Sequence, residues 1–177
     1  MDLHDAARNN NLERVRLLVE QGVDKDKGDW NGITPLYWAS CGGCLPAAQY
    51  LVEKGAALDK ANKNGWTPLN IAAANGHLEL CRYLLEQGAD RDKAANDGRT
   101  PLHIAAFHGR LEIAMLLMSY GADLSARSNL GHLPIDFAHT EEIKQAIFWT
   151  MMSGTPAAKR SVVPPARRLW LPNLSSL

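Results

Sequence analysis

The stretch that decides the fold is Thr100-Pro101-Leu102-His103-Ile104-Ala105-Ala106, in the second half of a 177-residue chain. Its opening tripeptide occurs earlier as Thr34-Pro35-Leu36 and Thr67-Pro68-Leu69, and later in the degenerate form Leu133-Pro134-Ile135. The period is 33 residues, and single glycines and leucines keep the same register: Gly22, Gly55, Gly88, Gly121, Leu12, Leu45, Leu78 and Leu111. Self-similarity at a fixed period of this length predicts a row of equivalent structural units.

One period can be interpreted position by position as two helices and a connector. Thr100 is suited to cap a helix, because its hydroxyl can accept a backbone N–H of the first turn that would otherwise have no partner. Pro101 suits the first position of this helix, where its missing N–H costs nothing. This helix has a narrow apolar stripe of leucine and alanine and ends near Gly109. Residues 111–118 predict a second, more apolar helix, and the polar residues 122–132 predict a connector with turns.

Two helices of this length cannot bury their apolar faces alone, so the units must stack on one another around a shared core. The pattern Thr-Pro-Leu-His-Ile-Ala-Ala, followed by Gly-Ala-Asp at 121–123, resembles the ankyrin repeat. The resemblance implies an all-α solenoid of helix-turn-helix units with β-hairpin-like fingers over residues 1–152. We expect units at about 1–33, 34–66, 67–99, 100–132 and 133–152, the first with a polar outer side and the last truncated.

Residues 153–177 differ from the repeats in composition. They contain four prolines, four basic residues and no acidic residue, which predicts a disordered tail. The tail nevertheless contains the apolar segment Leu169-Trp170-Leu171, and the preceding helix carries Phe148, Trp149 and Met152 outside its core stripe. Three alternatives stay open: the tail folds back onto this end of the stack, a partner covers the end, or the tail frays.

Charge and composition exclude several classes of protein. Nineteen Lys and Arg balance nineteen Asp and Glu, whereas a nucleic-acid binder carries a basic surplus. No apolar run reaches the ~18 residues of a membrane helix, and residues 1–5 lack the basic and apolar regions of a secretory signal. Three cysteines are typical of a reducing compartment. We expect a monomer without nucleic-acid or membrane contact, located in the cytoplasm, with the nucleus as an alternative.

Cys41-Gly42-Gly43-Cys44 is the motif that most suggests reactive chemistry. A redox dithiol requires a helix N-terminus and a zinc site requires two further ligands, whereas this pair follows a helix and has no second pair nearby. We interpret both cysteines as substitutions in a tolerant turn, with reversible oxidation as the alternative. Cys81 is predicted to lie in the core and His77 to be structural. No nucleophile has a base at a fitting spacing, so we predict a non-enzyme without catalytic, cofactor-binding or metal-binding residues.

The resemblance implies a concave face built from the finger tips and the ends of the first helices. The predicted partner-binding residues occupy these positions: Trp30, Asn31, Lys63, Asn64, Trp66, Asn96, Asp97, Arg99, Phe107, His108 and His132. Tryptophan and arginine are the side chains that most often anchor interfaces. For Trp30 and Trp66 the alternative is packing against the next finger.

The function implied is a non-catalytic scaffold or adaptor that binds a protein partner. One alternative is the substrate-recognition subunit of a ubiquitin ligase, since Leu169-Trp170-Leu171-Pro172 is similar to the Leu-Pro end of a suppressor-of-cytokine-signalling box. The helical Leu-Cys-Arg part of that box is missing. A second alternative is a regulator or inhibitor of an enzyme or transcription factor, and a third is a module of a larger chain.

Overall fold

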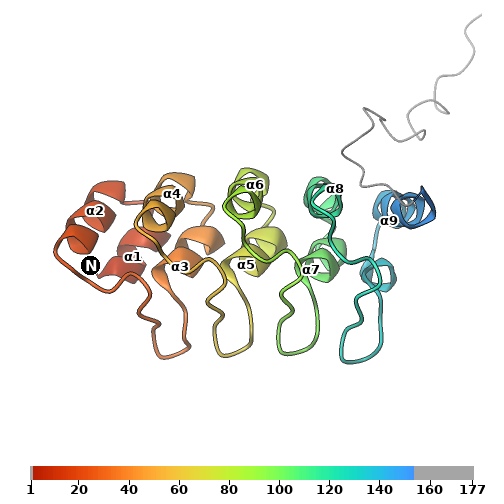
Figure 1. The fold of residues 1–177 in the computed structure, drawn as a ribbon, viewed down its shortest axis with the longest axis horizontal. Coiled ribbons are helices and arrows are strands. Elements are labelled where there is room, and N and C mark those ends of the chain that lie inside the picture. The colour runs from red at the N-terminus through yellow and green to blue at the C-terminus, as the bar shows by residue number, and fades with distance from the viewer. Residues whose placement is uncertain (1, 154–177) are drawn as a thin grey trace, which may run out of the picture.

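The computed structural model describes residues 2–153, which form ten helical elements and contain no strand (Figure 1). The elements are α1 (Leu3–Arg8), α2 (Leu12–Glu20), α3 (Pro35–Cys41), α4 (Leu45–Glu53), α5 (Pro68–Asn75), α6 (Leu78–Glu86), α7 (Pro101–Phe107), α8 (Leu111–Ser119), the 3-10 helix η1 (Pro134–Phe137) and α9 (Glu141–Ser153). Figure 1 shows successive helix pairs in a row, with the loops between pairs extending to one side. We call these loops the first to fourth fingers (22–33, 55–66, 88–99 and 121–132). The all-α solenoid predicted from the sequence is confirmed.

The repeated threonines precede the first helices of the three central units, α3, α5 and α7. Thr34 Oγ1 accepts the backbone N–H of Tyr37, and Thr67 Oγ1 accepts that of Asn70, each at 3.2 Å. These bonds satisfy amides that have no partner inside the helix. The proline after each threonine lies in the first turn, where its missing N–H costs nothing. The Thr-Pro pair therefore fixes where the three central units begin.

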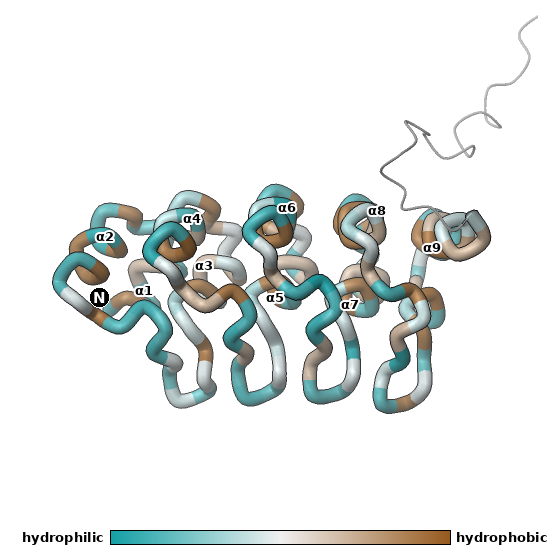
Figure 2. Tube along the Cα trace, in the orientation of Figure 1, coloured by the Kyte–Doolittle hydropathy of each residue, from teal (hydrophilic) through white to brown (hydrophobic). Residues whose placement is uncertain are grey.

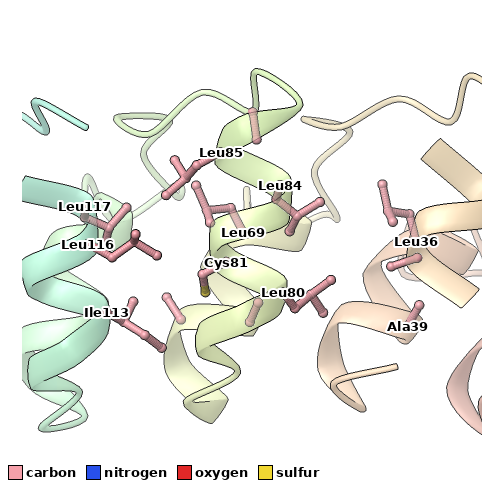
Figure 3. Close-up of a cluster of buried hydrophobic side chains, with 14 of the residues drawn as sticks. Leu36, Ala39, Leu69, Leu80, Cys81, Leu84, Leu85, Ile113, Leu116 and Leu117 are labelled. Carbon is pink, nitrogen blue, oxygen red and sulfur yellow. The ribbon is translucent and has the colours of Figure 1, made fainter. Parts of the chain in front are cut away.

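The core is shared between neighbouring units. The first helices contact one another in sequence from α1 through α3 and α5 to α7, and the second helices do the same from α2 to α9. Leu36, Leu69 and Leu102 are completely buried, and Figure 3 shows leucines from both helix layers between adjacent units. Alanines at the contacts between first helices leave room for the backbones to approach closely. Figure 2 shows the complementary pattern, with largely hydrophilic or neutral fingers.

The two ends of the stack differ. At the N-terminal end Asp2 caps α1 by accepting the Asp5 N–H at 2.9 Å, and residues 8–11 are exposed polar side chains. At the C-terminal end η1 is a single short turn, and α9 buries Ile143 and Ile147 against the stack. The outer face of α9 is uncovered within residues 2–153: the large exposed side chains are Phe148, Trp149, Met151 and Met152. The three alternatives for the tail concern residues outside the described range.

A buried imidazole links one pair of helices to the next finger. His103 Nε2 is 3.1 Å from the carbonyl of His132, so Nε2 carries the proton and donates the hydrogen bond. Nδ1 is then an acceptor and faces the Thr100 N–H at 3.2 Å and hydroxyl at 2.9 Å. The equivalent position one unit earlier is Asn70, which is completely buried. Neither polar atom of its side chain has a hydrogen-bond partner within the described range. This unit therefore lacks the contact that His103 makes.

We predict that Asn70→His raises the free energy of unfolding by about 1 kcal/mol, because the imidazole would donate to the Arg99 carbonyl and remove an unpaired buried amide. The equivalent residue in the preceding unit is Tyr37, whose ring is buried, so this position can accommodate a ring. The midpoint of urea unfolding measures the change. His103→Asn, the reverse replacement, should lower that midpoint. A lower midpoint for Asn70→His would show that the unpaired amide does not destabilise the stack.

Stability should also depend on pH through His103. Burial lowers the pKa of His103 below its ordinary value of 6.5, whereas the unfolded chain accepts a proton near that value. The unfolded state therefore binds more protons in this window. The free energy of unfolding should be fully retained above about pH 6.5 and should decrease as the pH falls toward the lowered pKa. Urea midpoints measured from neutral to acidic pH should fall more for the wild type than for His103→Asn. Equal slopes would contradict this assignment.

Candidate functional site

Each finger is closed by a main-chain hydrogen bond across a tight turn. In the second finger the N–H of Asn62 donates to the Trp66 carbonyl at 3.0 Å, and the other three fingers have the equivalent bond. The side-chain oxygen of Asn62 also accepts the N–H groups of Asn64 and Trp66, at 2.9 and 3.0 Å. Gly65 lies in the left-handed region with φ of 78°, which the turn requires. The finger tips are therefore defined turns.

Adjacent fingers are joined by a ladder of hydrogen bonds. Three backbone bonds make the ladder: Lys63 N–H to the Asn31 carbonyl at 2.9 Å, Asn96 N–H to the Asn64 carbonyl at 3.0 Å, and Asn129 N–H to the Asp97 carbonyl at 2.9 Å. The side-chain amides of Asn96 and Asn129 each add a 2.8 Å bond to a carbonyl of the preceding finger. The side chain of Asn96, a predicted contact residue, is thus engaged in the scaffold. The ladder holds the tips at a fixed spacing.

An open hollow of ≈ 320 Å³ lies between the second and third fingers. It is lined by five of the residues predicted from the sequence: Asn64, Trp66, Asn96, Asp97 and Arg99. Nε and a terminal nitrogen of Arg99 each lie 2.7 Å from the same carboxylate oxygen of Asp97. This pair fixes the guanidinium at the edge of the hollow, beside the half-buried Trp66 ring. The hollow offers an aromatic face, amide groups and an oriented ion pair.

Arg99 connects the hollow to α7. Its guanidinium carbon lies 5.8 Å from the centre of the Phe107 ring, a distance at which a cation and an aromatic face attract. Phe107 in turn contacts His108, with ring centres 5.1 Å apart. His132 is an exposed residue of the fourth finger and contacts Phe137, which lies 6.3 Å from Phe107. The structure therefore brings the C-terminal members of the predicted set into one continuous surface.

Three predicted residues lie outside this surface. Trp30 is at the tip of the first finger and is 80% exposed, so the alternative that it packs against the next finger is not what the structure shows. Asn31 is half-buried and is joined to the second finger through its carbonyl. Lys63 is exposed beside the hollow but does not line it. These residues extend the predicted face toward the N-terminal end.

Sequence reasoning missed two rings next to Phe107. Phe137, in η1, lies 5.5 Å from His103 and 5.6 Å from His132 between ring centres. His139 follows η1 and lies 5.2 Å from Phe107. Phe137 is equivalent to Ile104 in the preceding unit, which is buried, so the 33-residue period alone predicts a core position for it and gives no signal for this face.

The pKa of His108 is set by burial and by two nearby guanidinium groups. Burial lowers its pKa, and the nearby guanidinium groups of Arg110 and Arg99 lower it further. Arg110 is held by a 3.1 Å bond from its Nε to the Ala74 carbonyl. His108 is therefore neutral at neutral pH.

The cysteines have the environment of structural residues. Cys41 ends α3, and Cys44, the N-cap of α4, is buried with its thiol 3.4 Å from the Arg8 carbonyl. Burial raises the pKa of Cys44 and raises that of Cys81 to about 12. Cys81 is completely buried, which confirms the prediction that it belongs to the core. His77 Nε2 donates to the carbonyl of Cys41 at 3.1 Å and so braces this turn. No group of three potential metal ligands occurs in residues 2–153.

The same repeat is recognised by comparison with known families. A family model of ankyrin repeats, in its three-copy form, matches residues 3–62 and 54–128. The chain belongs to the ankyrin repeat family. A search of curated proteins gave no match. Ankyrin repeats are generally protein-binding modules and typically non-catalytic. No helix between residues 2 and 153 is long and apolar enough to cross a bilayer.

The hydrogen-bond ladder predicts that glycines in the fingers of this ankyrin domain differ in how strongly their replacement by alanine lowers stability. Gly65 and Gly22 have similar φ, 78° and 83°, but an added Cβ would approach the Asn96 nitrogen to 2.5 Å at Gly65 and meet nothing within 4 Å at Gly22. Gly22→Ala should cost about 1–2 kcal/mol of stability through backbone strain alone. Gly65→Ala should cost at least about 2 kcal/mol more, because it separates two fingers. Urea unfolding and hydrogen exchange of the Asn96 amide measure both effects. Equal losses would show that the ladder contributes little.

Proposed function

We propose that this ankyrin repeat domain is a non-catalytic scaffold or adaptor that binds a partner protein on its concave face. The binding region is centred on the hollow between the second and third fingers and extends over Arg99 to Phe107 and His108. The observation that carries the proposal is this hollow, because predicted anchor residues of two fingers converge on it. An oriented arginine beside aromatic rings is a typical anchor of protein interfaces.

The physical state of the face supports binding. The hydrogen-bond ladder holds the finger backbones before a partner arrives, so little backbone entropy is lost on association. Trp30 and Phe107 are large apolar side chains that remain 80% and 40% exposed. A partner that covers them gains apolar burial at little conformational cost.

The alternatives differ in what they require. A regulator or inhibitor of an enzyme or transcription factor would use the same concave face and differ only in the partner. The ubiquitin-ligase alternative depends on Leu169-Trp170-Leu171-Pro172, which lies outside the described residues, and no contact described in residues 2–153 favours it.

The test compares a four-site variant with the wild type. Trp30→Ala, Trp66→Ala, Arg99→Ala and Phe107→Ala combined should weaken capture of the native partner by about a hundredfold or more, since anchor residues contribute about 2 kcal/mol or more each. The unfolding midpoint should shift little, because none of the four is fully buried. Affinity capture from cells with mass spectrometry identifies the partner, and titration with the purified partner gives the affinity.

The matched control replaces four exposed residues on the second helices: Glu13, Glu79, Arg82 and Glu112. This outer-surface variant should bind as the wild type does. If the four-site variant keeps its partner while the outer-surface variant loses it, the concave face is not the binding surface. A large drop in the unfolding midpoint of the four-site variant with unchanged binding would make those side chains structural.

A further inference from the structure

The last helix carries a dense group of exposed apolar side chains. Phe148, Trp149, Met151 and Met152 of α9 are each between 44 and 71% exposed. Four of the nine large exposed apolar side chains of residues 2–153 therefore lie within five residues of one helix. They form a continuous surface, because residues three and four apart in a helix lie side by side. We call these four side chains the α9 patch.

The patch results from the position of α9 at the end of the stack. Each of α2, α4, α6 and α8 is followed by another second helix that packs against it. α9 buries Ile143 and Ile147 on the side of the preceding unit, but no helix follows it within residues 2–153 (Figure 1). Terminal units of repeat proteins need a polar outer side, which the exposed polar residues 8–11 supply at the other end. An apolar outer side at this end indicates a contact surface.

The size of the α9 patch favours a small occupant. α9 has 13 residues, so its outer side is about 20 Å long and about 10 Å wide, or on the order of 200 Å². A stable interface between two proteins buries about 800 Å² on each partner. The patch alone is therefore too small to hold a second copy of the chain, whereas a segment of a few residues matches it.

The chain itself contains such a segment. Leu169-Trp170-Leu171, which lies outside the described residues, begins 16 residues after Ser153. Sixteen residues can span up to about 50 Å, which exceeds the length of α9, about 20 Å. A tether of this length gives an effective concentration on the order of millimolar. Even a weak contact is therefore populated within one chain, which favours this segment over a separate molecule.

Charge also favours this segment. Arg167 and Arg168 directly precede it, and residues 154–177 contain four basic and no acidic residues. Residues 1–153 contain fifteen Lys and Arg against nineteen Asp and Glu, a net charge of −4. On α9, Glu141 and Glu142 lie seven residues before the aromatic pair of the patch, about two turns along the same side of the helix. Neither forms an ion pair within residues 2–153, and Lys144 is the one basic residue of α9.

We propose that the segment 169–171 packs on the α9 patch and caps the C-terminal end of the stack, with the ring of Trp170 against Trp149 and the methionines. Methionine side chains are flexible and adapt to aromatic surfaces. An extended chain covers about 10 Å from Arg167 to Trp170, and α9 rises about 10 Å from Glu142 to Trp149. The apolar and the ionic contacts can therefore form together. The cap does not involve the concave face, so it goes beyond the proposed function.

The test is a double-mutant cycle in the full chain, measured by urea unfolding. Trp149→Ala and Trp170→Ala should each lower the urea midpoint by about 0.5 M, and the double variant should fall little further, because each change removes the same contact. Hydrogen exchange of the amides of residues 148–152 should be about fivefold faster in Trp170→Ala than in the wild type, because the last turns of α9 lose their cover.

Two matched controls separate the cap from general effects of the substitutions. Trp30→Ala, at the exposed tip of the first finger, should combine additively with Trp170→Ala. Val162→Ala, which changes an apolar residue outside the segment, should leave exchange in α9 unchanged. Additive effects of Trp149→Ala and Trp170→Ala, with α9 exchange unaltered in the latter, would overturn the cap. Coupling that depends on protein concentration, together with a dimer in sedimentation, would overturn it in favour of a second copy.

Discussion

The structure depends on the fact that a single pair of short helices has no interior of its own. Leu69 is completely buried because α3 and α7 lie on either side of α5. Full burial of a leucine side chain contributes about 2 kcal/mol, and this gain exists only when the neighbouring unit is present. Stability is therefore a property of contacts between units, and each unit is held in place by the next.

The same constraint produces the row of fingers. Because the helices stack at a constant spacing, the loops between them emerge at that spacing as well, and equivalent backbone groups in successive fingers come within hydrogen-bond distance. Glycines with positive φ allow the turns, and the amide of Asn96 strengthens the ladder. A surface made from separate loops thus acquires the rigidity of the helical stack. Polar and aromatic side chains at the finger tips can therefore differ from one unit to the next, because hydrogen bonds between the finger backbones hold the tips in place.

The repeat made much of this predictable from the sequence. A strict period places Leu102 and Cys81 in the core, since the residues at equivalent positions must all face the neighbouring unit, and both are completely buried. The sequence could predict the residues that line the hollow as candidate contact residues, but it could not predict that they enclose a hollow between two fingers. Whether Asn96 binds a partner or a neighbouring carbonyl depends on the distance between fingers, which the period does not give. Phe137 and His139 were missed because the period equates them with Ile104 and Ala106, which are buried.

The buried imidazole of His103 connects the core to the surface. Its Nδ1 faces the helix cap at Thr100, and its Nε2 bonds the carbonyl of His132 in the fourth finger. His132, whose ring is exposed, is thus held by its own backbone to a group inside the stack. Asn70 makes no such bond within the described chain, so the third finger depends on the ladder and on the Arg99–Asp97 pair. The fourth finger is therefore held by a buried group as well as by the ladder, whereas the third is held by the ladder and by its own ion pair. The proposed surface spans both fingers.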